Sequence, residues 1–135
     1  MATLLSKFRI EYSSMTVVQD IGKRPDPSMY TEFRSRLGNW MLDTEAGETE
    51  ETHPWKISEN ELSAQKEKTF RNIRLRQLLK QYSSDAKLIV MTLPMPKKGL
   101  LSSGLYMAWL DTLSRDMPPI LLLRGNQTSV LTYYS

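Results

Sequence analysis

The sequence has no cysteine and a single histidine among its 135 residues. Disulfides, thiolate nucleophiles, Cys-ligated zinc and iron–sulfur clusters are therefore excluded, and His53 alone cannot build a multi-histidine metal site. The longest apolar run, from Met117 to Leu123, is short and contains two prolines, whereas a transmembrane helix needs about 20 residues. The first residues also lack the apolar region of an export signal. These absences predict a soluble, intracellular, single domain over residues 1–135, with no metal site.

Glycine is sparse, and its placement bears on nucleotide binding. The six glycines are scattered, so no Gly-rich loop exists to let backbone amides approach a phosphate. The best anion candidate is the pair Lys97 and Lys98 with Ser102, because it follows a predicted strand, where ligands bind in open α/β sheets. The simpler interpretation of this segment is a solvated loop.

The residues of catalytic chemistry are few and poorly placed. His53, Glu50 and Glu51 lie in a segment without large apolar residues, where nothing buries a carboxylate to tune its pKa. No G-x-S-x-G turn presents a nucleophile. We therefore expect that the protein is not an enzyme and uses no cofactor.

Charge is uneven along the chain, although the net charge is only +3. Residues 43–51 hold five acids and no base, and residues 66–80 hold six bases against one acid. Such a basic run is found on nucleic-acid or acidic-lipid surfaces, but also on solvated helix faces that complement an acidic loop nearby. No aromatic platform accompanies the bases, so we favour the solvated face and expect no nucleic-acid partner.

Apolar spacing predicts the helices. The chain opens inside a helix with Leu4, Leu5 and Phe8 on one face, and residues 26–41 form the next helix, with Pro27 in its first turn. Ser58 and Glu61 form a capping box in which each side chain binds the other's amide. The helix behind it is expected to run to about Tyr82, with bases around a buried stripe of Phe70, Ile73, Leu75, Leu78, Leu79 and Tyr82. A last helix starts at Ser102.

The strands alternate with these helices. Short apolar runs predict strands at residues 15–18, 87–93, 120–123 and 130–134, the last as a hairpin partner of the one before. Runs that are apolar on both faces suit a parallel sheet covered on both sides. The expected fold is therefore α/β, a largely parallel sheet with helices on both faces, and residues 43–53 are expected to be a mobile acidic loop.

Several segments resemble one known family. These are Lys87–Pro94, Ser102–Leu110, Pro118–Asn126 and Ser129–Ser135, extended by Leu4–Ile10, Pro54–Ile57 and Arg71–Leu75. Together they closely resemble the extreme C-terminus of cation-chloride cotransporters, most of all the sodium-potassium-chloride branch. The variable part is residues 21–53, and Gly104 stands where this branch is expected to carry alanine.

The resemblance implies a function for the chain. It implies the distal part of a cytosolic regulatory and dimerisation domain, on the cytoplasmic side of the plasma membrane, with a half-domain fold similar to universal stress proteins. The implied partners are the transmembrane part of the same transporter, a second copy of the domain and regulatory kinases. Thr44, Thr49 and Thr52, beside carboxylates in the acidic loop, are the candidate regulatory residues.

The resemblance also implies missing parts. Relatives carry a strand directly before the first helix and, further upstream, the ion-binding transmembrane helices, so no ion site is carried over. We expect the chain alone to be marginally stable or prone to aggregate. The alternative is a stand-alone nucleotide- or anion-binding domain similar to universal stress proteins, using Lys97, Lys98 and Ser102.

Overall fold

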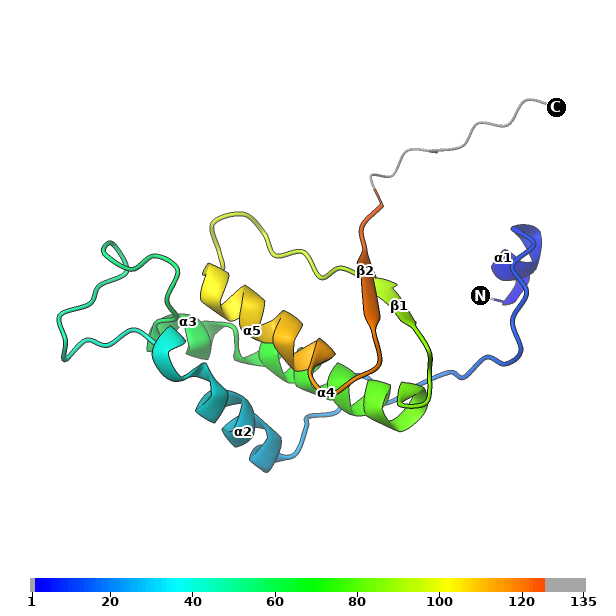
Figure 1. The fold of residues 1–135 in the computed structure, drawn as a ribbon, viewed down its shortest axis with the longest axis horizontal. Coiled ribbons are helices and arrows are strands. Elements are labelled where there is room, and N and C mark those ends of the chain that lie inside the picture. Colours follow the sequence, from blue (N-terminus) through cyan, green and yellow to red (C-terminus); the bar gives the residue numbers. More distant parts are fainter. Residues whose placement is uncertain (1, 126–135) are drawn as a thin grey trace, which may run out of the picture.

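The structure, a computed structural model, describes residues 2–125 (Figure 1). Its helices are α1 (Ala2–Lys7), α2 (Pro27–Leu37), α3 (Glu59–Ala64), α4 (Lys66–Ser83) and α5 (Ser103–Ser114), with a 3-10 turn η1 (Gly38–Trp40) after α2. The strands are β1 (Ile89–Thr92) and β2 (Ile120–Leu123). The predicted strand at residues 130–134 lies outside the described residues.

The two strands pair in parallel, which confirms the α/β class. Ile89 lies opposite Ile120 and Thr92 opposite Leu123, and α5 is the crossover helix between them. Parallel neighbours require such a crossover because a tight turn reverses the chain. The ladder is shorter than the run 87–93 because β2 supplies only four partners.

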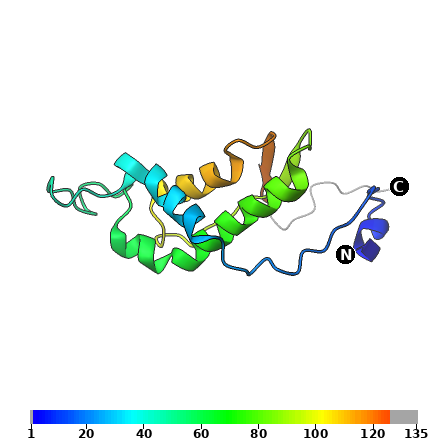
Figure 2. The same ribbon diagram turned by 90° about the horizontal axis from the view of Figure 1, so that it is seen from below.

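The prediction of helices on both faces of the sheet is wrong for the described residues. Ile89 is buried, whereas its neighbour Val90 is 56% exposed, and Leu121 and Leu123 on the same face are 46% and 50% exposed. The strands stand at the C-terminal ends of α4 and α5 (Figures 1 and 2). A strand that is apolar on both faces does not indicate which face is covered by helices. The sequence pattern therefore predicted helices on a face of the sheet that is exposed. The finer likeness to universal stress proteins stays a prediction.

The core lies among the helices rather than on the sheet. The helix pair with the most extensive packing is α4 and α5, and Trp109 of α5 donates its indole N–H to the Thr69 hydroxyl of α4 over 3.0 Å. Burying an indole requires such a partner for its N–H. The buried cluster comprises Phe33, Leu37, Ile57, Leu62, Ile73, Leu105 and Trp109.

The helices differ from the prediction at their ends. The helix expected from the capping box breaks at Gln65 into α3 and α4, and the helix expected at 26–41 tightens into η1 after Leu37. Tyr82, expected in the buried stripe, is 55% exposed because it lies in the last turn of α4. Arg76, expected on the solvated face, is only 7% exposed.

The N-terminal region carries the largest departure. Residues 15–18 form no strand, and α1 buries none of its residues. Among residues 2–125, no strand lies beside this β-branched run to complete its hydrogen bonds, and β propensity depends on such pairing. Figures 1 and 2 both show α1 lying apart from the helices that form the core. That residues 1–135 form a single domain remains a prediction.

Candidate functional sites

The acidic loop (residues 43–53) begins and ends at a closed stem. Met41 and Ile57 form an isolated parallel bridge, in which the Ile57 N–H donates to Trp40 O and the Leu42 N–H donates to Ile57 O, both over 2.8 Å. Ile57 is fully buried in the core. The loop is therefore attached directly to the packed part of the molecule.

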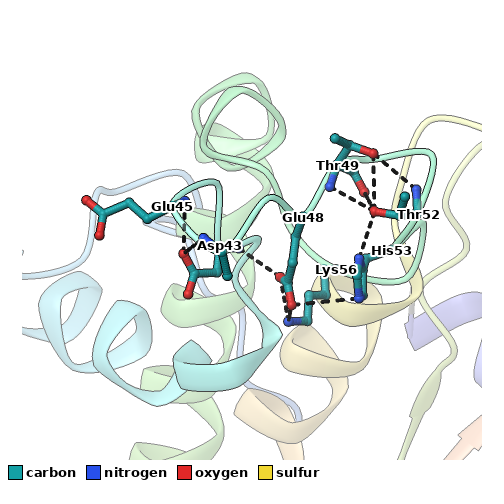
Figure 3. Close-up of polar contacts among 8 residues, drawn as sticks. Asp43, Glu45, Glu48, Thr49, Thr52, His53 and Lys56 are labelled. Carbon is teal, nitrogen blue, oxygen red and sulfur yellow. Dashed lines mark hydrogen bonds and ion pairs between the residues drawn. The ribbon is translucent and has the colours of Figure 1, made fainter.

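The first half of the acidic loop is a turn organised by Asp43 (Figure 3). Its Oδ1 accepts hydrogen bonds from the N–H groups of Glu45 and Ala46, each over 3.1 Å. Aspartate favours turns because its side chain bonds the backbone two residues on. Thr44 is exposed in this turn, and its hydroxyl makes no hydrogen bond to the described residues.

The second half of the acidic loop is organised by two threonines. The Thr52 hydroxyl accepts from the Thr49 N–H over 2.9 Å and donates to Thr49 O over 3.1 Å. The same oxygen lies 2.9 Å from His53 Nδ1 (Figure 3). Thr52 therefore carries far more of the loop's hydrogen bonding than Thr44 does.

One ion pair joins the acidic loop to its stem. Lys56 Nζ donates to both carboxylate oxygens of Glu48, over 2.6 and 2.7 Å, and both side chains are largely buried. His53 Nε2 lies 3.7 Å from the same carboxylate. The Lys56 hydrogen bond, followed by one from the Asp43 N–H, lowers the pKa of Glu48 because both favour its charged form.

The anion candidate at Ser102 is occupied by the protein's own carboxylate. The Ser102 side chain caps α5 by accepting from the Leu105 N–H, as its sequence position predicts. The Ser102 N–H, however, donates to Glu61 Oε1 over 2.6 Å. The adjoining cavity, of about 540 Å³, is lined by Glu50 and Glu61 among others, and these carboxylates disfavour a second anion. Lys97 and Lys98 are exposed in the loop before it.

The contact of Glu61 with Ser102 is one that the sequence does not predict. The Ser58 half of the capping box is confirmed, since Ser58 Oγ accepts from the Glu61 N–H over 3.2 Å. The other half is wrong, because the Glu61 carboxylate turns to Ser102 instead. The i, i+3 spacing describes one helix start, and no local signal reveals that a second helix start competes for the carboxylate.

The bases of α4 have several different roles. Lys66 Nζ lies over the rings of Tyr30 and Phe70 at 5.5 and 5.7 Å, a cation–π arrangement. Within residues 2–125, no base of α4 forms an ion pair with the acidic loop, whose Glu48 pairs with Lys56 instead. On the sequence alone, the bases of this helix are expected to complement the acidic loop. The structure does not show that pairing.

Among residues 2–125, no helix combines the length and the apolar character needed to cross a bilayer.

Comparison with known proteins gives a consistent result. The profile of solute carrier family 12 matches residues 1–135. The chain is 53% identical to solute carrier family 12 member 2 of Danio rerio and 50% identical to that of Homo sapiens. It is also 50% identical to a bumetanide-sensitive sodium-(potassium)-chloride cotransporter of Manduca sexta. Each alignment covers 100% of this chain and 12% of the relative.

Proposed function

The chain belongs to solute carrier family 12, the cation-chloride cotransporters, and on this premise we propose that it is a cytosolic regulatory and dimerisation segment of a sodium-potassium-chloride symporter, without transport activity of its own. One observation carries the proposal: 50% identity over the whole chain to a sodium-(potassium)-chloride cotransporter. The transmembrane part of the transporter, a second copy of the segment and regulatory kinases are its proposed partners. Its proposed place is the cytoplasmic side of the plasma membrane.

The acidic loop is the proposed switch of this segment. A phosphate on Thr49 or Thr52 adds between about −1.5 and −2 charges beside Glu48, Glu50 and Glu51. That charge repels the neighbouring carboxylates and removes the Thr49–Thr52 hydrogen bonds. The stem ends on the buried Ile57, so a change in the conformation of the loop is transmitted directly to the core. That change would shift the segment between two populations that differ in how it packs against a partner.

Among the three threonines, the hydrogen bonds support Thr52 most strongly for this proposed role. Thr52 binds Thr49 and lies against His53, which in turn faces Glu48. Thr44 makes no comparable side-chain contact with the described residues. Modification of Thr52 is therefore expected to open the acidic loop, and modification of Thr44 is expected to leave its second half intact.

The test uses the full-length transporter that carries this segment. Residues 43–53 are replaced by a Gly-Ser linker of equal length, and rubidium uptake is measured with and without phosphatase inhibition. We expect basal uptake to be retained and the response to the inhibitor to be lost. T52A should reproduce that loss and T44A, the matched control, should not. Unchanged uptake and an unchanged response in the linker variant would remove the regulatory role from the loop.

The nucleotide-binding alternative remains a separate prediction. Calorimetric titration of the 135-residue chain with ATP distinguishes it, because a regulatory segment of this kind is expected to show no tight binding. If Lys97, Lys98 and Ser102 form an anion site that Glu61 blocks, E61A should bind phosphate more tightly than the unchanged protein. Equal affinities would exclude the Ser102 amide from anion binding.

A further inference from the structure

A second cavity, independent of the proposed transporter role, lies beyond the carboxyl end of β1. It measures about 180 Å³, and its walls come from α4, from the loop that follows β1, and from α5. Figure 1 shows that loop running back along α5 to the start of the helix. In open α/β folds, ligands bind in the crevice outside the carboxyl ends of the strands, so the cavity has the position of a ligand site.

One wall is cationic. Lys68 and Arg71 of α4 line the cavity and are exposed, and within residues 2–125 neither forms an ion pair. Other cations of the chain do find carboxylates: Arg24 pairs with Glu67 and Lys56 with Glu48. An arginine fork binds two oxygens of a phosphate or carboxylate at once, and the ammonium adds a second charge.

The other walls are apolar, and their polar atoms are already used. The Tyr106 hydroxyl donates to Pro94 O over 2.9 Å, and the Trp109 indole N–H donates to Thr69. These bonds fix both aromatic rings. The half-buried Tyr106 offers apolar surface together with Pro94 and Pro96, whereas Trp109 lines the cavity but is only 5% exposed. No carboxylate lines this cavity, in contrast to the larger one beside Ser102.

From this combination we propose that the groove between Lys68, Arg71 and Trp109 binds a small organic anion, a phosphomonoester whose apolar part lies against the aromatic and proline wall. The oxyanion takes its hydrogen bonds from Lys68 and Arg71. The volume is below the roughly 300–1,000 Å³ of pockets that hold drug-sized ligands, so a compact ligand fits and a nucleotide does not.

The test is a titration of the 135-residue chain with phenyl phosphate, followed by amide and indole proton NMR. We expect a saturable shift of the Trp109 indole signal. The variant K68Q/R71Q should weaken binding about tenfold or more, because charge-assisted hydrogen bonds are lost. K80Q/K87Q, which removes the same charge from exposed lysines outside the groove, should bind within about twofold of the unchanged chain.

Two further arms define the ligand class. Inorganic phosphate should bind several-fold more weakly than phenyl phosphate, because it lacks the apolar part. R71K, which keeps the charge and loses the fork, should be intermediate and provides a second measure if K68Q/R71Q does not fold. The proposal is overturned by an unmoved Trp109 signal, by equal weakening in K80Q/K87Q, or by equal affinity for inorganic phosphate. Binding only to vesicles containing 30% phosphatidylserine would also overturn it.

Discussion

Arg76 shows how a single charged residue can be a core residue. Its Nη1 donates to Thr112 O over 2.8 Å and to Arg115 O over 2.5 Å. Both carbonyls belong to the C-terminal end of α5, where the carbonyls lack partners within the helix and the helix dipole is negative. Arg76 therefore satisfies the end of a neighbouring helix, and its burial is compensated by hydrogen bonds and by the dipole.

Replacing Arg76 by methionine should lower the free energy of unfolding by about 1.5–3 kcal/mol, since hydrogen bonds to a charged group are lost and the carbonyls are left buried. R76K, which keeps one donor in reach, should lose roughly half as much. Urea unfolding followed by circular dichroism measures both. K80M, on the exposed side of the same helix, should change stability by less than about 0.5 kcal/mol. Equal losses for K80M and R76M would contradict this role.

The Glu48 carboxylate makes the acidic loop sensitive to acid. Its pKa is lowered in the folded protein, first by the Lys56 hydrogen bond, so the carboxylate stabilises the fold above its ordinary pKa of 4.5. That contribution is lost as the pH falls below 4.5 and through the lowered pKa. K56M should raise the pKa of Glu48 toward its ordinary value.

Carbon-13 NMR of the Glu48 carboxyl measures this directly across the acidic range. K98M removes a lysine outside the loop and should leave the Glu48 midpoint where it is. E48Q should remove this part of the acid dependence of stability. An unchanged midpoint in K56M would show that the ion pair does not hold the carboxylate in its charged form.

At the scale of elements, the start of α5 is fixed by a close backbone approach. The Gly104 N–H donates to Trp55 O over 2.9 Å, and a Cβ added at Gly104 would lie 2.6 Å from that oxygen and 3.2 Å from Ile57 Cγ1. Glu61 binds Ser102 at the same helix start. The segment between the acidic loop and α3 is thus attached to α5 by backbone contacts that leave no room for a side chain.

G104A should therefore lower the free energy of unfolding, by up to about 2 kcal/mol. Alanine gains about 1 kcal/mol of helix propensity, but overpacking against backbone atoms typically costs 1–3 kcal/mol. Thermal and urea unfolding of G104A and of G22A, whose added Cβ meets nothing within 4 Å, form a matched pair. Stability equal to or above that of the unchanged chain would show that residues 55–57 shift at little cost.

Local signals predicted the elements that depend on local physics. Ser102 and Ser58 cap helices as their positions predict, and the two apolar runs at 89–92 and 120–123 pair in parallel. These features arise within a few residues or from burial alone. The same reasoning placed Thr52 in the acidic loop, but nothing in its spacing ranked it above Thr44.

The features that were missed depend on contacts between distant segments. Arg76 is buried because α5 ends beside it, and Glu61 leaves its capping box because Ser102 is close. Residues 15–18 have the composition of a strand, but the part of the chain that the structure describes places no strand beside them, and composition without a partner does not make a strand. The groove at Lys68 and Arg71 likewise exists only because the loop after β1 returns along α5.

At the scale of the whole molecule, one face of the sheet is an apolar surface that residues 2–125 leave uncovered. Val90, Leu121 and Leu123 are about half exposed on one face of β1 and β2, and contiguous apolar patches of this kind mark interaction sites. This surface supports the proposed dimerisation, because a second copy presents the same patch.

We expect the 135-residue chain to self-associate, with a sedimentation coefficient that rises with concentration. The double substitution V90K/L121K should shift the association to at least about tenfold higher concentration, because charges facing each other oppose contact. S63K/A64K, which adds the same charge at exposed positions of α3 and leaves the face of the sheet unchanged, should have a smaller effect. A sharp unfolding transition from a monomer at all concentrations would contradict the prediction.

The parallel register of β1 and β2 also sets an order of events in folding. Ile89 can meet Ile120 only after the intervening chain has crossed over, so closing this long segment costs entropy before any ladder hydrogen bond forms. The packing of α4 on α5 through Trp109 and Thr69 brings the two strands together and shortens that search. The helix pair is therefore expected to act as the folding nucleus and the sheet to form last, so the amides of the ladder should be the slowest to gain protection from hydrogen exchange during refolding.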